Sequence, residues 1–260
     1  MDVPRIIAVA NQKGGVGKTT TAINLAACLA AAEQRTLLVD VDPQANATTG
    51  IGIDMRSTKH NVYHALLGHV ASSEVVFPTA LPALQIIPSR RELVGAEVEL
   101  VELPDREQRL KIALHPIAKD YAYVLIDCPP SLGFLTLNAL VAADSVLIPL
   151  QCEYYALEGL GQILETVRLC QQTLNPLLAV EGILLTMFDG RVNLAGQVAA
   201  EVRQHFGQRV FRTVIPRNIR LGEAPSHGKP IILYDIRCAG AEGYLQLARE
   251  VIDGAKARVG

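Results

Sequence analysis

Residues 11–20, NQKGGVGKTT, combine three glycines, two lysines and two threonines at a spacing suited to polyphosphate binding. Gly14, Gly15 and Gly17 let backbone N–H groups close around phosphate oxygens, and a helix that starts directly afterwards adds the positive end of its dipole. Lys18 is placed to pair with the β- and γ-phosphates, and Thr19 to coordinate Mg²⁺. We therefore predict an ATP- and Mg²⁺-binding P-loop, with contacts from Gly14, Gly15, Val16, Gly17, Lys18, Thr19 and Thr20.

Two acidic segments follow apolar runs. In LLVDVDPQ, Asp40 and Asp42 close the apolar run, and in YVLIDCPPS, Asp127 does the same. A carboxylate at the end of a buried strand is costly unless it is paired or near a metal ion, and strand ends that face a nucleotide are where such groups serve. The alternatives are ordinary loop acids before a proline turn for Asp40 and Asp42, and a plain strand-terminating acid for Asp127.

The elements that position these residues alternate along the chain. Short runs rich in Val, Ile and Leu predict strands buried on both faces, and the longer amphipathic stretches between them predict helices. This pattern indicates an α/β fold, a single doubly wound domain over residues 1–260 with a mainly parallel central sheet flanked by helices. The expected strands are Ile6–Ala10, Thr36–Val41, Leu84–Pro88, Tyr123–Asp127, Ser145–Leu150, Ala179–Thr186 and Val210–Val214; the expected helices lie at about 18–32, 106–118, 133–143, 155–173, 192–206 and 240–257.

Composition excludes some classes of protein. No apolar run approaches the roughly 18 residues that span a bilayer, and the N-terminus resembles neither a signal nor a transit peptide. The five cysteines are scattered, without a CxxC pair, so we expect neither disulfides nor a zinc site and favour a cytoplasmic location. The net charge of −2 gives no global argument for nucleic acid, so any such site must be a local patch.

The glycine-rich loop departs from the ordinary GxxxxGK[ST] pattern. Gln12 stands where that pattern has its first glycine, and Lys13 is an additional lysine. On spacing alone Lys13 could be a solvated surface charge. The string KGGVGKTT, however, resembles the deviant Walker A motif of the ParA/MinD superfamily of P-loop ATPases. The resemblance implies that Lys13 reaches the ATP of a partner in a nucleotide-sandwich homodimer, where an extra cation stabilises charge on the transferred phosphoryl group.

The acidic segments take roles from the same resemblance. LLVDVDPQ is similar to the switch I segment of this superfamily, which implies that Asp42 supports the attacking water and that Asp40 lies near the metal. YVLIDCPPS resembles a Walker B segment, in which Asp127 binds a Mg²⁺ water. Lys13, Lys18 and Asp42 are then the expected catalytic residues. The related nitrogenase iron protein carries a cluster on cysteines, but no second cysteine accompanies Cys128 in a comparable loop, so we expect a buried structural thiol.

Further segments resemble the chromosome-partitioning ParA (Soj) branch over nearly the whole chain: NATTGIG (46–52), QCEYYALEGL (151–160), LLTMFDGR (184–191) and VIPRNIRLGEAPSHGKPI (214–231). The branch implies that Pro216 and Asn218 flank the adenine, although a surface proline turn is the plain alternative. Because the first expected strand starts near residue 5, we expect no N-terminal helix-turn-helix domain, and no operator-specific DNA binding through one.

Basic residues gather in one region. Residues 186–237 hold eight lysines or arginines and four acids, while the whole chain is acidic. A local basic surface is what non-specific phosphate contact requires, but a solvated face is the common alternative. The branch resemblance places non-specific contacts to double-stranded DNA on Arg191 and Arg220.

The resemblance implies an ATP-dependent switch for chromosome or plasmid partitioning. An ATP-bound dimer binds DNA of any sequence on the nucleoid, and hydrolysis, slow alone and stimulated by a ParB-like centromere-binding partner, releases it. Alternatives are a biosynthetic enzyme of the same fold, an adaptor whose dimer docks something other than DNA, or a MinD-like membrane ATPase. We expect no stable membrane association, because the apolar stripe of the last helix is typical of core packing: Tyr244, Leu247, Ala248, Val251, Ile252 and Ala255.

Overall fold

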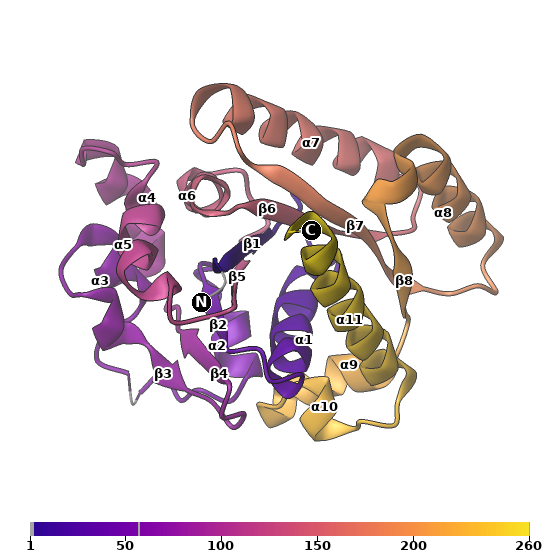
Figure 1. Cartoon of the computed structure of the whole chain (residues 1–260), viewed down its shortest axis with the longest axis horizontal. Helices are drawn as coiled ribbons and strands as arrows, with labels where there is room; N and C mark the ends of the chain where they lie inside the picture. Colours follow the sequence, from indigo (N-terminus) through magenta and orange to yellow (C-terminus); the bar gives the residue numbers. More distant parts are fainter. Residues whose placement is uncertain (1–2, 57, 260) are drawn as a thin grey trace.

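The computed structural model describes residues 3–56 and 58–259, and an eight-stranded β-sheet forms its centre (Figure 1). The strands lie in the order β3-β4-β2-β5-β1-β6-β7-β8. All neighbouring pairs are parallel except β3 and β4, which run antiparallel. The bounds are Arg5–Val9 (β1), Thr36–Asp40 (β2), Phe77–Pro78 (β3), Leu84–Ile87 (β4), Tyr123–Asp127 (β5), Ser145–Gln151 (β6), Ala179–Phe188 (β7) and Val210–Pro216 (β8).

Helices cover both faces of the sheet (Figure 1). The helix α1 packs against the neighbouring strands and against α11, which also contacts β8. The helices are Lys18–Ala31 (α1), Asn46–Gly50 (α2), Val62–Leu67 (α3), Leu93–Glu99 (α4), Arg109–Ala118 (α5), Phe134–Ala142 (α6), Ala156–Thr173 (α7), Asn193–Phe206 (α8), Ile219–Glu223 (α9), Ile231–Tyr234 (α10) and Ala239–Val259 (α11).

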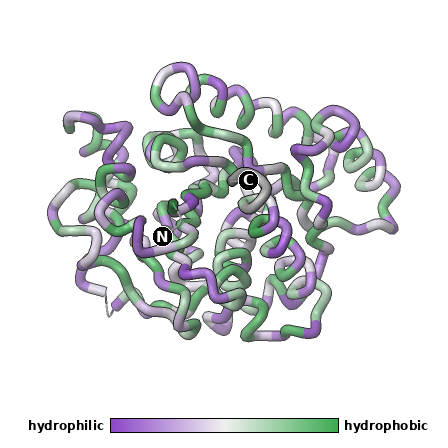
Figure 2. The backbone as a smooth tube through the Cα atoms, viewed as in Figure 1, coloured by the Kyte–Doolittle hydropathy of each residue, from purple (hydrophilic) through white to green (hydrophobic). Residues whose placement is uncertain are grey.

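Two hydrophobic cores result from the alternation of side chains along each strand. Ile7 and Val9 of β1 join a core with α1 and α11, whereas Ala8 and Ala10 point into a core on the opposite face. All four side chains are fully buried, as expected for a central parallel strand. In Figure 2, hydrophobic and hydrophilic residues alternate along the outer helices α7 and α8, which have one face on the sheet and one in solvent.

The doubly wound α/β prediction is confirmed. All seven expected strands and all six expected helices are present, with ends within about three residues of the predicted ones. Missing from the prediction were the two-residue β3 and five short helices, which are α2, α3, α4, α9 and α10. These elements have seven residues or fewer, which is too short for hydrophobic periodicity to reveal them.

The last helix packs on the body of the protein. One side of α11 is buried in the hydrophobic core that this helix shares with α1; its buried residues there include Tyr244, Leu247, Ala248 and Val251. The Tyr244 hydroxyl lies 3.2 Å from the Thr21 hydroxyl of α1. This confirms the core-packing interpretation of the apolar stripe for these residues. Within the described ranges, no helix is both long enough and apolar enough to cross a membrane.

Candidate nucleotide site

The glycine-rich loop joins the carboxyl end of β1 to the first residue of α1. Gly15 and Gly17 adopt φ values of +76° and +86°, which side-chain-bearing residues rarely take. A Cβ at Gly14 or Gly15 would have no described heavy atom within 4 Å. The loop therefore has open space above its backbone, where an oxyanion can approach the N–H groups at the start of α1.

Neighbouring strands hold this loop in place. The Asn11 amide donates to the Pro149 carbonyl of β6 at 2.8 Å, and its side-chain oxygen accepts the Lys13 N–H at 3.0 Å. The Thr186 hydroxyl of β7 donates to the Val16 carbonyl at 2.8 Å. Sequence reasoning did not identify Asn11 or Thr186, since their contacts depend on strands more than a hundred residues away. Both restrict the loop before any ligand arrives, which is the preorganisation that a binding site needs.

Lys18 lies folded over the loop. Its ammonium donates to the Lys13 carbonyl at 2.9 Å, and the side chain is largely buried. Burial lowers the pKa of Lys18, while the nearby Asp127 is the main influence that opposes this shift. A desolvated cation beside an acid and an open set of N–H groups provides a strong local field for phosphate.

Two acids lie side by side at the ends of β2 and β5, where Asp40 is in register with Asp127. Asp40 accepts three hydrogen bonds, from the Thr48 hydroxyl at 2.7 Å, the Thr48 N–H at 2.8 Å and the Asp42 N–H at 3.1 Å. Both oxygens of Asp127 are buried without a hydrogen-bond partner in the described part of the chain. The two acids thus differ: Asp40 is tied to the Asp42 and Thr48 segment that follows it, whereas Asp127 has unused acceptor capacity.

The pKa values of the pair reflect the same environment. Burial raises the pKa of Asp40 to about 6, although the Thr48 and Asp42 hydrogen bonds oppose the rise. Burial and then the charge of Asp40 raise the pKa of Asp127 well above its ordinary value, while Thr19 and Lys18 act in the opposite direction. A buried carboxylate that lacks a partner is stabilised when a cation or a cation-bound water reaches it.

These residues fit ATP and Mg²⁺. Magnesium usually keeps several waters and binds through one or two protein groups together with substrate phosphates, so a dedicated cage of ligands is not required. The Thr19 hydroxyl and the unpartnered Asp127 carboxylate supply such groups beside the loop. The contribution of Asp40 to metal binding stays a prediction, because its oxygens already accept hydrogen bonds from Thr48 and Asp42.

Asp42 lies two residues beyond the end of β2. Its side chain accepts the Gln44 N–H at 2.9 Å, and the residue is only 5% exposed. It also influences the pKa of both Lys18 and Asp127, which places it in the same charged cluster. The role of Asp42 in orienting a water near the phosphates stays a prediction.

The Lys13 ammonium is paired with an acid that lies outside the glycine-rich loop. Its ammonium forms a 2.7 Å ion pair with Glu153, just after β6. Both side chains are partly exposed, at 36% and 49%, so the pair is weak and easily exchanged. The neighbouring Tyr154 and Tyr155 are 77% and 63% exposed. Lys13 therefore lies at an accessible rim of the site with two exposed aromatic residues beside it.

A cavity of about 280 Å³ lies beside the P-loop. Pro216 and Asn218, predicted to flank adenine, are not among its lining residues. Pro216 ends β8 at the carboxyl edge of the sheet, and Asn218 caps α9 by accepting the Arg220 N–H at 2.9 Å. Their base contacts stay a prediction. The cavity is lined by Thr19, Thr20, Ile23, Asn24, Asn46, Thr49, Ala224, Pro225 and Lys229.

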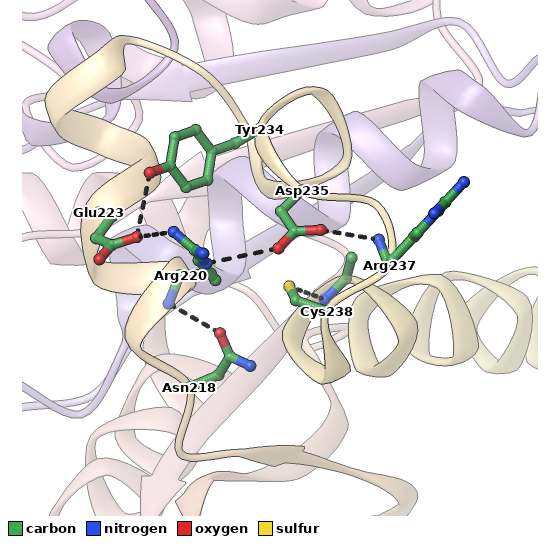
Figure 3. A network of polar contacts seen from close by, with 8 residues as sticks. Asn218, Arg220, Glu223, Tyr234, Asp235, Arg237 and Cys238 are labelled. Carbon is green, nitrogen blue, oxygen red and sulfur yellow. Dashed lines mark hydrogen bonds and ion pairs between the residues drawn. The ribbon is translucent and has the colours of Figure 1, made fainter.

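The predicted DNA-contacting arginines are exposed and paired. Arg191 makes a two-pronged contact with Asp189 at 2.7 and 2.8 Å. Arg220 contacts Glu223 at 2.8 Å and Asp235 at 3.6 Å (Figure 3). All eight basic residues between positions 186 and 237 are exposed, so this region can present positive charge to solvent. The eight are Arg191, Arg203, Arg209, Arg212, Arg217, Arg220, Lys229 and Arg237.

Cys128 follows Asp127 directly and is fully buried. Burial raises the pKa of its thiol, so the group stays protonated at neutral pH. This environment confirms the buried location expected for Cys128.

A family model described as an AAA domain matches residues 4–180 of the chain. The chain is 61% identical over 250 residues to the chromosome partitioning protein ParA of Myxococcus xanthus, covering 96% of this chain and 88% of that protein. It is 58% identical over 247 residues to the sporulation initiation inhibitor protein Soj of Bacillus subtilis, covering 95% and 98%.

Solved structures show the same architecture. A cobyrinic acid a,c-diamide synthase from Mycobacterium smegmatis, with a bound ATP analogue and magnesium, superposes with a TM-score of 0.86 at 38% identity, covering 98% of this chain and 96% of that one. The cell division ATPase MinD of Pyrococcus furiosus superposes with a TM-score of 0.78 at 24% identity, covering 96% and 98%, and so supports the fold alone.

Proposed function

The chain belongs to the ParA family of chromosome-partitioning ATPases, and from this premise we propose that it is an ATP-driven switch that binds DNA as a dimer and releases it after hydrolysis. One observation supports ATP and Mg²⁺ binding most directly. Asp127 is fully buried, and its oxygens have no hydrogen-bond partner among the described residues. It lies beside Lys18 and the open glycine loop. The family and the site thus agree on Mg²⁺-dependent ATP hydrolysis.

Each residue of the site has a separate role in the proposal. The N–H groups of the loop and the start of α1 bind phosphate oxygens, and Lys18 leaves the Lys13 carbonyl to pair with them. Thr19 and Asp127 hold Mg²⁺ directly or through its waters. Asp42 orients the attacking water. When bound, Mg²⁺–ATP supplies the phosphoanhydride bond that water cleaves.

Dimerisation rests on Lys13. In a single copy its ammonium is held by Glu153, an exposed acid that gives only weak stabilisation. The triphosphate of a second copy offers more negative charge than one carboxylate does, so Lys13 exchanges partners when two nucleotide-loaded copies meet face to face. The exposed Tyr154 and Tyr155 lie at the same rim and become part of the contact.

DNA binding rests on the eight exposed basic residues of positions 186–237, including Arg191 and Arg220. Phosphate contacts by arginine and lysine carry no sequence information, so the binding is non-specific and falls steeply with salt. A dimer presents two such surfaces and binds a long duplex more tightly than a monomer does. Because the nucleoid holds most of the DNA in the cytoplasm, we expect the ATP-bound form to lie on the nucleoid.

A partner completes the cycle. The relatives named above partition chromosomes, which supports a ParB-like, centromere-bound protein as the activator of hydrolysis for this chain. In this proposal the activator acts on ATP-loaded dimers only, so that release of DNA occurs where the centromere complex is.

An ATP-dependent biosynthetic activity is the second candidate, because one structural neighbour is named a cobyrinic acid a,c-diamide synthase. Such an enzyme needs a group that activates its co-substrate. Burial raises the pKa of Cys28 to about 12 and that of Cys152 to about 11, so neither supplies a thiolate nucleophile at neutral pH. The higher identity to a chromosome partitioning ParA, 61% against 38%, favours partitioning.

The proposal is tested with three variants by size-exclusion chromatography with ATP and Mg²⁺, and by titration of random-sequence duplex DNA. Asp42→Ala is expected to accumulate as a dimer that binds DNA, because ATP is retained. Lys18→Ala is expected to stay monomeric and to bind no DNA. Arg220→Glu is expected to dimerise normally but to lose at least about tenfold in DNA affinity at low salt.

Each half of the proposal has its own contrary result. Asp42→Ala that remains monomeric with saturating ATP contradicts the switch. Arg220→Glu that keeps the wild-type DNA affinity contradicts the placement of the DNA surface but leaves the ATPase assignment intact.

A further inference from the structure

Two acids hold the guanidinium of Arg220 (Figure 3). Its Nη1 donates to a carboxylate oxygen of Glu223 at 2.8 Å, and its Nε lies 3.6 Å from a carboxylate oxygen of Asp235. Arg220 remains 53% exposed, so solvent and solutes reach it beside these acids. The guanidinium is therefore shared between its own chain and whatever anion approaches from outside.

The two acids come from different segments. Glu223 ends α9, the same short helix that carries Arg220, whereas Asp235 follows α10. The Tyr234 hydroxyl donates to Glu223 at 3.1 Å, and the Arg237 N–H donates to Asp235 at 3.2 Å. Both carboxylates are thus held in position by groups other than the arginine, as Figure 3 shows.

The segments on both sides are held by further hydrogen bonds. Asn218, the residue that we place beside the adenine, caps α9 through the Arg220 N–H. On the other side, the Ile231 N–H at the start of α10 donates to the Asn24 side chain of α1 at 2.7 Å, and α1 begins at the P-loop. The acids and the arginine consequently have defined positions and do not meet by chance on flexible loops.

A carboxylate oxygen and a phosphate oxygen bind a guanidinium with the same geometry, so each excludes the other from the same N–H groups. We propose that Glu223 and Asp235 are intramolecular competitors of DNA phosphate at Arg220, which set how weakly this arginine binds DNA. This inference rests on the proposed DNA-binding function. Because exposed ion pairs are weak, the competition lowers the affinity without abolishing it.

This competition limits the DNA affinity of a protein that must also release DNA. A free exposed arginine binds any polyanion, including DNA met by a single copy, whereas an arginine already paired with carboxylates gains little from one such contact. Two copies that bind together still hold a long duplex, because avidity adds the contacts of the second copy. The acids therefore keep DNA binding by a single copy weak and leave the dimer as the form that binds.

The test uses the full chain with ATP and Mg²⁺, and fluorescence anisotropy of a random-sequence duplex over a salt series. Glu223→Gln and Asp235→Asn keep an oxygen acceptor for Tyr234 and for the Arg237 N–H, so the local fold is preserved. Each is expected to raise DNA affinity by about two- to fivefold, and the double variant by about tenfold. The matched control is Glu201→Gln, an exposed acid of α8 that changes the net charge equally; its expected effect is below about 1.5-fold.

A second background separates competition from net charge. In Arg220→Ala, the gain from Glu223→Gln is expected to vanish, because no guanidinium remains to be released. A gain that persists in Arg220→Ala overturns the inference, as does an unchanged affinity in both single variants. Weaker DNA binding by Glu223→Gln also overturns it, since the acids would then orient the arginine for DNA.

Failure of the proposed function is a distinct result. Wild-type protein that binds no DNA at low salt overturns both proposals. Wild-type binding that falls steeply with salt, together with acid variants indistinguishable from Glu201→Gln, overturns only the competition at Arg220.

Discussion

Neighbouring acids in the sheet can have opposite functions, and Asp40 and Asp127 illustrate this at the residue scale. Asp40 accepts three hydrogen bonds from Thr48 and Asp42, so its cost of burial is offset within the chain. Asp127 is fully buried, and its oxygens accept no hydrogen bond within the described ranges. A buried carboxyl whose ionised form lacks hydrogen bonds destabilises the ligand-free protein, and a bound cation relieves that cost.

Replacement of Asp127 by asparagine tests this directly. Asp127→Asn removes a carboxyl that is costly to bury, so the free energy of unfolding without nucleotide is expected to rise by roughly 1–2 kcal/mol. Wild type gains about 2.7 kcal/mol from ligand at about 100 times its Kd, and the variant is expected to lose the Mg²⁺-dependent part of that gain. Urea unfolding with ATP, in the presence of Mg²⁺ or of a chelator, measures both effects.

The contrary result for this residue is equally clear. A variant that is less stable than wild type without nucleotide, or that gains as much from Mg²⁺, shows that Asp127 is a structural acid. Thr48→Val serves as the comparison: it removes a hydrogen bond from Asp40 and is expected to destabilise the protein with or without nucleotide.

At the element scale, α2 and the 3₁₀ turn Ala224–His227 pack through glycines. Gly52 follows α2 with φ at +91°, and Gly228 follows the turn with φ at +60°. A Cβ on Gly52 would stand 2.6 Å from the Gly228 carbonyl oxygen. The segment after α2 therefore touches the segment after the Ala224–His227 turn, backbone to backbone.

Gly52→Ala is expected to lower the free energy of unfolding by about 1–3 kcal/mol, because it combines a strained φ with a clash against backbone. The matched control is Gly196→Ala, near the start of α8, where a Cβ meets no described atom within 4 Å. That change is expected to stabilise the protein by roughly 0.5–1 kcal/mol. Thermal or urea unfolding measures both, and a Gly52→Ala variant as stable as wild type contradicts the close packing.

The sequence predicted long elements better than short ones for a physical reason. Buried parallel strands are recognised as continuous apolar runs, and helices of nine residues or more carry enough hydrophobic periodicity to be recognised. A short helix such as α4 places Leu93 and Ala96 in the core while Val94 and Val98 remain exposed, so its pattern shows no single apolar face. Such an element is defined by its neighbours and not by its own sequence.

The residues of the candidate site were likewise predictable where local sequence determines their position. The glycine loop and the acids at strand ends were predictable because each depends on local sequence and on the edge of a parallel sheet. The partners of these residues were not predictable, because they come from distant strands and helices. Glu153 beside Lys13, Thr186 beside Val16 and Asp235 beside Arg220 are examples.

At the scale of the whole molecule, Arg5 ties three distant parts of the chain together. Its guanidinium contacts both oxygens of Glu181 in β7 at 2.7 and 2.8 Å and donates to the Val251 carbonyl of α11 at 3.0 Å. The Glu181 side chain is only 4% exposed, and the Ser145 hydroxyl also donates to it at 2.8 Å. The pair joins β1, β7 and α11 on one side of the sheet.

Arg5→Met is expected to lower the free energy of unfolding by about 3–5 kcal/mol, because it leaves the Glu181 carboxylate buried without its cation. Arg5→Met combined with Glu181→Gln is expected to recover part of that loss, since the charge is then removed as well. Urea unfolding of the three proteins measures the coupling. Losses that simply add would contradict a direct dependence of one side chain on the other.

The order of the strands also has a consequence for synthesis on the ribosome. The strand that leads into the P-loop, β1, is made first, yet it lies between β5 and β6, whose residues 123–127 and 145–151 are made much later. With chain growth at about 5–20 residues per second, β1 spends several seconds without either neighbour. Nucleotide cannot assist folding during that interval, since the loop is held by Pro149 and Thr186. The nascent chain therefore acquires its capacity for ATP only after most of it has been translated.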